Sequence, residues 1–194
     1  MTPIVLASGS ASRRKILDGA GVRFTVARPT VDEDILKRSM TGLSPADVAL
    51  ALAKAKGGSV EAPGALVIAA DQVMEFEGRA YDKPKSMDEL RTRLLAMAGQ
   101  THFLRGGVAM FKDGEVIAEL TESSALTLRE MAPREVDLYI ETIGEELLST
   151  VGGYALEGVG ARLFERIEGD FFSILGLPLL PVLNVLRREG GIAF

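Results

Sequence analysis

The 194-residue chain is 47% hydrophobic and 25% charged, which is typical of a globular domain long enough to form its own hydrophobic core. Its net charge of −5, with no block of like charge, argues against an extended nucleic-acid-binding surface but allows a local anion pocket. The chain has no cysteine and a single histidine, His102, which excludes disulfides, thiolate or polyhistidine metal sites and cysteine nucleophiles. Any metal would be held by carboxylates and phosphate oxygens, as Mg²⁺ and Mn²⁺ are.

An apolar run at Ile4 to Ala7 predicts a buried strand, followed by a tight turn of small polar residues. Residues 13–17 then predict the first turns of a helix. A helix N-terminus offers unpaired N–H donors and a partial positive charge, both of which suit an oxyanion. The hydroxyls of Ser8 and Ser10 and the guanidinium of Arg13 would complete a phosphate cradle. An ordinary strand–turn–helix with a serine N-cap explains the same residues, and locally it is the favoured interpretation.

The N-terminal apolar run is far shorter than a signal peptide or a membrane-spanning helix. We therefore expect a cytoplasmic protein with no membrane partner. With only 6% aromatic residues and an acidic net charge, we also expect no nucleic-acid partner.

A second strand is predicted at Phe24 to Ala27, leading into the acidic segment 32–34. Ser44 and Pro45 predict a helix start, with a serine N-cap and a proline at the first helical position. We expect Val48, Leu52 and Ala55 to form the inward-facing stripe of this helix, which also carries Lys54 and Lys56. The acidic segment suits a metal site and Lys54 a phosphate, but both are more often solvated surface groups.

Residues 65–70 are all apolar and predict a central buried strand that ends at Asp71. Ligand crevices in α/β folds open at the carboxyl ends of strands, where a carboxylate can hold a divalent cation or orient a water. A cap or the start of a hairpin is an equally good interpretation of Asp71.

Loose alternation from Met74 to Tyr81 around Glu77-Gly78 predicts a turn. The hairpin would bring Lys83 beside Asp71, where a lysine could neutralise a triphosphate. A solvated loop charge is the commoner use of such a lysine.

The second half predicts a capping box at 86–89 that opens a helix, and a long antiparallel hairpin of 101–111 and 115–128 around Asp113-Gly114. A helix at 133–143, a strand at 171–175 and a closing helix at 179–188 follow. Leu90, Leu94 and Met97 should face inward. Glu157 lies between Gly153 and Gly158, where backbone can approach a ligand and a carboxylate can accept from the ring N–H groups of a base. We expect His102 to be structural.

Alternating helices and strands together with a long hairpin predict an α/β fold, with a mixed twisted β-sheet flanked by helices. We expect a single domain over residues 1–194, with two lobes around a central cleft as its alternative form. The phosphate-binding Gly-x-x-x-x-Gly-Lys-Ser/Thr motif, the dinucleotide fingerprint and the Gly-x-Ser-x-Gly elbow are all missing.

Seven segments resemble, in order and over nearly the whole chain, the Maf family of nucleoside triphosphate pyrophosphatases, once described as septum-formation inhibitors. They are Leu6–Ser10 with Arg13, Val31–Glu33, Lys54-Ala55, Ala70-Asp71 with Val73, Lys83-Pro84, Gly152–Tyr154 and Gly176–Pro178. The resemblance implies a Maf/inosine-triphosphatase-like fold, often dimeric. It also implies cleavage of the α–β phosphate bond of a nucleoside triphosphate with Mg²⁺ or Mn²⁺.

By this resemblance Asp71 is the general base, or the group that positions water and metal, and Glu33 helps to hold the metal. The residues that would bind the triphosphate are Ser8, Ser10, Arg13, Lys54 and Lys83.

Three positions separate the family branches, and here they are Ser12, Gln72 and Glu157. The branch that acts on dTTP and UTP typically has arginine, threonine and glutamine, and the 7-methyl-GTP branch has tryptophan, glutamine and glutamate. Gln72 and Glu157 match the second branch, and Ser12 matches neither. The resemblance therefore favours a guanine nucleotide similar to 7-methyl-GTP. A nucleotide-binding regulator of cell division with little catalysis is the alternative function.

Overall fold

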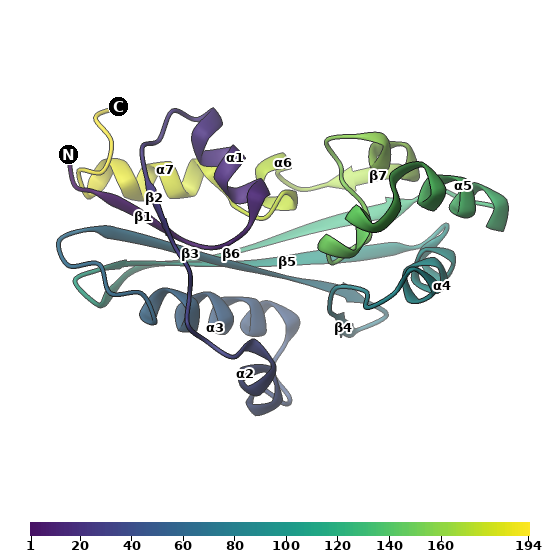
Figure 1. Ribbon diagram of the computed structural model, residues 1–194, viewed down its shortest axis with the longest axis horizontal. Coiled ribbons are helices and arrows are strands. Elements are labelled where there is room, and N and C mark those ends of the chain that lie inside the picture. The colour runs from purple at the N-terminus through teal and green to yellow at the C-terminus, as the bar shows by residue number, and fades with distance from the viewer. The chain divides into compact units, whose positions relative to one another are not determined.

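A computed structural model describes all residues, 1–194, and divides the chain into two compact units (Figure 1). The first unit comprises residues 1–72, 105–123 and 170–194, and the second comprises residues 73–104 and 124–169. The long strands β3 (Leu66–Phe76), β5 (Thr101–Lys112) and β6 (Glu115–Leu128) contribute residues to both units. No helix of the chain combines the length and the apolar character needed to cross a membrane.

The β-sheet is mixed, as the sequence predicts. Its strand order is β2-β1-β3-β5-β6-β7, and β4 pairs with β3. The strand β1 (Ile4–Ala7) is parallel to β2 (Thr25–Ala27) and to β3, whereas β4 (Arg79–Tyr81) and β7 (Phe164–Glu168) pair antiparallel with β3 and β6. The α/β fold class is confirmed.

Both predicted hairpin turns are present. Glu77 and Gly78 have φ values of 51° and 72°, and Asp113 and Gly114 have φ values of 52° and 85°. Positive φ at both central residues matches the right-handed twist of the flanking strands, which explains why these dipeptides join β3 to β4 and β5 to β6.

In the first unit, helices cover both faces of the sheet (Figure 1). The helices α1 (Ala11–Gly19) and α7 (Leu179–Arg188) lie on one face, and α3 (Pro45–Gly58) lies on the other. Side chains of β3 alternate between them: Leu66, Ile68 and Ala70 join the core of α1 and α7, and Val67 and Ala69 join the α3 side.

The inward stripe of α3 differs from the expectation. Val48 and Ala55 are only half-buried, and the buried stripe is Ala49, Leu52, Ala53, Lys56 and Gly57. A Cβ on Gly57 would lie 2.2 Å from the Phe111 ring, so the missing side chain lets the helix pack closely on the sheet.

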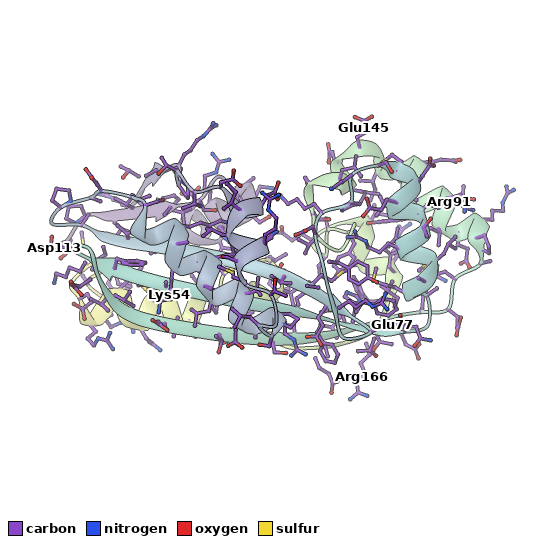
Figure 2. The ribbon with its side chains drawn as sticks, turned by 90° about the horizontal axis from the view of Figure 1, so that it is seen from below. Lys54, Glu77, Arg91, Asp113, Glu145 and Arg166 are labelled. Atoms are coloured by element: carbon purple, nitrogen blue, oxygen red, sulfur yellow. The ribbon has the colours of Figure 1, made fainter.

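The second unit contains α4 (Met87–Met97), α5 (Pro133–Ile143), the 3₁₀ turns η1 (Gly144–Ser149) and η2 (Val159–Leu163), and the strands β4 and β7. As predicted, the Ser86 hydroxyl caps α4, and Leu90, Leu94 and Met97 are buried. Arg91 of α4, labelled in Figure 2, lies in this unit. It forms a bidentate ion pair with Asp137 of α5. The predicted boundaries of α5 and α7 are confirmed.

Two predictions of local structure were wrong, and one helix was not predicted. Phe171–Ile174 form a helical turn, α6, because the Asp170 carboxylate accepts from the Ser173 N–H and caps it. The acidic segment opens a helix, α2 (Glu33–Ser39), with Asp32 as its N-cap. The strand β3 does not end at Asp71 but continues to Phe76, although its parallel partner β1 ends at Ala7.

Candidate functional site

The turn after β1 is built around two serines. The Ser10 hydroxyl accepts from the Arg13 N–H and caps α1, and the Ser8 hydroxyl accepts from the Ser10 N–H at 3.1 Å. Locally this is the serine-capped strand–turn–helix that the sequence favoured. The same arrangement leaves the N-terminus of α1 beside two hydroxyl groups, which is also the geometry of a phosphate site.

The Arg13 side chain is buried rather than solvated, with 9% of the residue exposed. Its Nε donates to the Gly176 carbonyl at 2.8 Å and its Nη1 donates to the Ser8 hydroxyl at 3.2 Å. Burial lowers the pKa of the Arg13 guanidinium, and the negative charges of Asp71 and Glu33 oppose that shift. Arg13 therefore links the first turn to the segment before α7 and lies within the field of both carboxylates.

Asp71 and Glu33 converge on one lysine, Lys56. The Lys56 Nζ lies 3.1 Å from Asp71 Oδ1 and 3.0 Å from Glu33 Oε1. The Lys56 and Asp71 side chains are only 11% and 13% exposed, whereas that of Glu33 is 45% exposed. Alternation along β3 explains the contact, because residue 71 follows Val67 and Ala69 on the face that α3 covers.

Sequence reasoning named Lys54 for the site and gave Lys56 no role. Lys54 lies on the exposed side of α3 (Figure 2). Its ammonium pairs with Glu119 at 2.5 Å. Residues two apart on a helix face different directions, so Lys54 reaches the exposed Glu119 of β6 whereas Lys56 reaches the nearly buried Asp71 of β3. In the structure Lys56 falls on the buried stripe, three and four residues after Ala53 and Leu52, and its spacing from Leu52 was the only hint of this in the sequence.

Gln72 points the opposite way from Asp71. Its amide Nε2 donates to the carbonyls of Ser173 and Ile174 at 2.9 and 3.3 Å, and so fastens the turn α6. Ser12, on α1, is half-buried. Ser8, Ser10, Arg13, Glu33, Lys56 and Asp71 all lie in the first unit, and so does Gln72, whose side chain points to the other face of the sheet from that of Asp71.

Lys83 and Glu157 belong to the second unit, where each is exposed on a loop. Lys83 lies between β4 and α4, and Glu157 lies in the turn before η2. That the hairpin brings Lys83 beside Asp71 stays a prediction.

His102 is buried in the second unit, as expected of a structural residue. Its Nε2 lies 2.5 Å from the Tyr154 hydroxyl, and burial lowers its pKa to about 4. The Tyr154 ring also packs edge-on against Phe164, with centroids 4.8 Å apart. The imidazole is therefore neutral at neutral pH and belongs to an aromatic cluster.

The family described as Maf-like protein matches residues 3–189 of the chain. The chain belongs to the Maf family. Its relatives include the nucleoside triphosphate pyrophosphatase of Caulobacter vibrioides, 45% identical over 99% of this chain and 98% of that protein. They also include the 7-methyl-GTP pyrophosphatase of Rhizobium meliloti, 42% identical over 97% of both chains. Among solved structures, a HAM1 protein from Coxiella burnetii has a TM-score of 0.41 at 14% identity, covering 66% of this Maf protein and 73% of that chain.

Proposed function

We propose that this Maf protein is a nucleoside triphosphate pyrophosphatase that cleaves the bond between the α and β phosphates. In the proposed reaction, a water oxygen bonds to the α-phosphorus and the bond from that phosphorus to the bridging oxygen breaks. Pyrophosphate leaves with the bridging oxygen, and a nucleoside monophosphate remains. The names of the similar Caulobacter and Rhizobium proteins support this reaction.

The convergence of Asp71 and Glu33 on Lys56 is the observation that carries the proposal. Lys56 holds one carboxylate oxygen of Asp71, Oδ1, and so fixes the direction of the second oxygen. In the proposed mechanism that second oxygen accepts the proton of the attacking water. A fixed carboxylate is useful because general-base catalysis depends on the position of the base relative to the proton.

The same pair of carboxylates fits a divalent cation of the kind the family uses. Lys56 already contacts one oxygen of each carboxylate at about 3 Å, so the cation would bind the oxygens of Glu33 and Asp71 that Lys56 leaves free, and Mg²⁺ commonly takes one or two carboxylates plus substrate phosphates. No group of three or more acidic or histidine ligands occurs in the chain, so phosphate oxygens and water would have to complete the coordination. When bound, Mg²⁺ or Mn²⁺ would supply positive charge to offset that of the phosphates.

We propose that the phosphates bind at the N-terminus of α1. Ser8, Ser10 and the N–H groups of the first turn supply hydrogen-bond donors, and the buried Arg13 supplies a charge that water does not screen. Lys83 and Lys54 would add positive charge, Lys54 after release from Glu119. Charge neutralisation and alignment are the main tasks in phosphoryl transfer, so no serine, cysteine or histidine nucleophile is required.

For the base, we propose a guanine nucleotide similar to 7-methyl-GTP. Glu157 is exposed on a glycine-flanked loop and can accept from the ring N–H and amino groups of guanine. The Gln72 amide donates to α6, so its contribution would be to hold that turn in place. Ser12 cannot stack on a methylated purine, which leaves the methyl group without a partner at that position.

Pyrophosphate release from a panel of nucleotides tests the proposal. The panel contains 7-methyl-GTP, GTP, dTTP and UTP with Mg²⁺ or Mn²⁺, and each assay is repeated with Asp71→Asn. We expect release that prefers the guanine nucleotides and that Asp71→Asn abolishes without unfolding the protein. Release that survives in Asp71→Asn would remove Asp71 from the mechanism. Binding without any release by the wild type would favour a nucleotide-binding regulator of cell division.

A further inference from the structure

Arg93, in the second unit, contacts residues well outside its own helix. It lies on α4 and is only 7% exposed. Its Nη1 donates to two backbone carbonyls from distant parts of the chain, Asp82 at 2.6 Å and Val151 at 2.8 Å. Its Nη2 pairs with the Glu89 carboxylate at 2.7 Å. One guanidinium thus joins two loops and a helix.

Each of the two loops carries a residue proposed to contact the substrate. Asp82 immediately precedes Lys83, and Val151 begins the glycine-containing segment that leads to Glu157. Arg93 and Glu89 hold the Lys83 loop at both ends, because the Glu89 carboxylate also accepts from the Lys85 N–H at 3.0 Å. This contact, together with Arg93, lowers the pKa of Glu89.

The second loop is pressed against the same helix. Gly153 has a φ of 70°, and a Cβ there would lie 2.0 Å from Leu90 Cδ1, so the loop backbone rests directly on α4. The Gly153 carbonyl accepts from the Tyr139 hydroxyl at 3.3 Å. The position of this loop therefore depends on α4 at both Val151 and Gly153.

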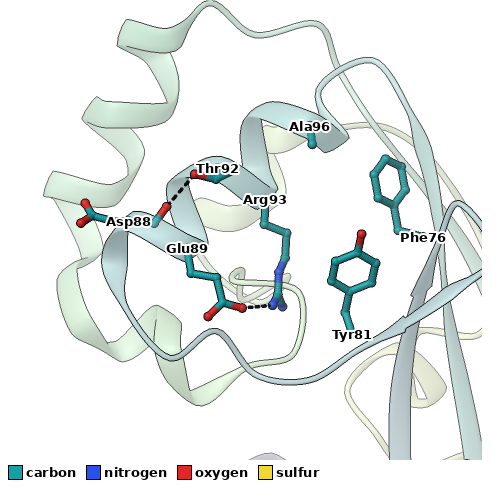
Figure 3. A pocket seen from close by; sticks show the side chains of 7 residues that line it. All are labelled: Phe76, Tyr81, Asp88, Glu89, Thr92, Arg93 and Ala96. Atoms are coloured by element: carbon teal, nitrogen blue, oxygen red, sulfur yellow. Dashed lines mark hydrogen bonds and ion pairs between the residues drawn. The ribbon is translucent and has the colours of Figure 1, made fainter.

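Arg93 also stacks on Tyr81, at the start of the Lys83 loop. The Arg93 Cζ lies 5.1 Å from the centre of the Tyr81 ring. Figure 3 shows the guanidinium between Glu89 and Tyr81, on the wall of an open pocket. The pocket has a volume of about 370 Å³, so solutes can reach this region.

We propose that Arg93 is a positioning residue that fixes the spacing between Lys83 and Glu157, and thereby sets both triphosphate affinity and base selectivity. The inference rests on the proposed function, in which Lys83 meets the phosphates and Glu157 meets the base. Arg93 acts on the substrate only through the backbone carbonyls of Asp82 and Val151. A guanidinium suits this role because its planar donors can serve several acceptors at fixed angles, which the ammonium of a lysine cannot do.

The experiment compares Arg93→Ala with the wild type and with Arg91→Ala. Arg91 is a matched control, since it lies on the same helix and pairs with Asp137 rather than with either loop. For Arg93→Ala we expect KM for the preferred nucleotide to rise roughly tenfold to a hundredfold, because Lys83 and Glu157 would be misplaced. The differences in KM between the nucleotides of the panel should become smaller. Arg91→Ala should keep the wild-type KM and selectivity. A merely structural role for Arg93 would lower stability and kcat without changing KM or selectivity, and that result would overturn the proposal.

Chemical rescue adds a second readout. Because the pocket beside Arg93 is open, guanidinium ion at concentrations far below those that unfold proteins should restore KM and selectivity in Arg93→Ala. Urea, which has the same shape without the charge, should not. Equal effects of guanidinium and urea would contradict a charge-specific role. If Arg93→Ala does not fold, Arg93→Lys is used instead, and it should show the same changes in KM and selectivity to a smaller degree.

Amide hydrogen exchange separates this inference from the proposed function. Residues 82–85 and 151–158 should exchange faster in Arg93→Ala than in Arg91→Ala, and guanidinium should slow them again. If the wild type releases no pyrophosphate, the proposed function fails, and the exchange data alone then show whether Arg93 fastens the loops. Unchanged exchange in both segments would refute the inference even in an active enzyme.

Discussion

The ammonium of Lys56 lies 3.1 Å from Asp71 Oδ1 and joins the centre of β3 to α3. Both side chains are nearly buried, so the pair is only weakly screened by solvent. The contact makes Lys56 part of the geometry that holds the proposed base, and it can be tested separately from Asp71 itself.

Lys56→Gln should lower kcat for pyrophosphate release by about tenfold or more, because an unfixed base is poorly aligned with the water. It should also lower the free energy of unfolding by about 1–3 kcal/mol, since Asp71 loses a partner in a nearly buried site. Steady-state kinetics and urea titration measure the two effects. Lys112→Gln is the control, because Lys112 pairs with Glu189 at the far end of β5. Wild-type kcat in Lys56→Gln would exclude the positioning role.

Arg13→Lys should destabilise the protein by about 1–3 kcal/mol, although it keeps the charge. A lysine cannot satisfy both the Gly176 carbonyl and the Ser8 hydroxyl in the geometry that the guanidinium uses. Arg14→Lys, at an exposed position on the same helix, should change stability little. Denaturant titration of both variants gives the comparison, and equal stabilities would contradict a structural role for the Arg13 fork.

Gln72→Leu should remove the side-chain donor from the Ile174 carbonyl and one of the two donors from the Ser173 carbonyl, which keeps the Gly176 N–H, and lower the free energy of unfolding by about 1–3 kcal/mol. Because Gln72 and Asp71 face opposite ways, kcat on the best nucleotide should change less than in Lys56→Gln. Kinetics on the nucleotide panel and denaturant titration test both statements. A loss of kcat as large as that of Lys56→Gln would show that the two faces are coupled.

Stability should fall as the pH decreases from about 6.5 to about 4 because of His102. Burial lowers its folded-state pKa to about 4, so in this interval the unfolded chain binds the proton and the folded chain does not. The stability contributed by the neutral imidazole is therefore present above pH 6.5 and is lost as the pH falls toward the folded-state pKa, about 3 kcal/mol in all. Urea titrations at several pH values, on the wild type and on His102→Gln, isolate the effect. Equal pH dependence in both proteins would disprove it.

Much of the fold could be predicted because local signals agree with the tertiary structure. Asp113-Gly114 and Glu77-Gly78 have the turn chemistry of hairpins, and Ser44 and Ser86 cap their helices. The failures occurred where a local signal was overridden. Residues 171–175, apolar except for Ser173, resemble a strand, but the Asp170 cap starts a helical turn at 171–174. The strand β7 is mostly exposed at the edge of the sheet, so it lacks the alternating apolar pattern that identifies strands.

The candidate site was predictable in part, for a related reason. Ser8, Ser10, Arg13, Glu33 and Asp71 were named from motifs, and the first unit gathers them. Lys56 was missed because the inward stripe of α3 depends on which helix face fits the sheet. In the structure the buried face includes the close contact of Gly57 with Phe111, two residues far apart in the sequence. Periodicity alone does not contain this information.

Asp71 and Gln72 are consecutive residues that point in opposite directions. Their orientation determines which sequence changes β3 can tolerate. The first projects toward α3 and the second toward α6, so the body of the sheet separates them. A substitution at position 72 would therefore change the support of α6 without removing the contact between Asp71 and Lys56. Inserting a single residue before Asp71 would instead exchange the two faces, which makes β3 tolerant of replacement and intolerant of a change in length.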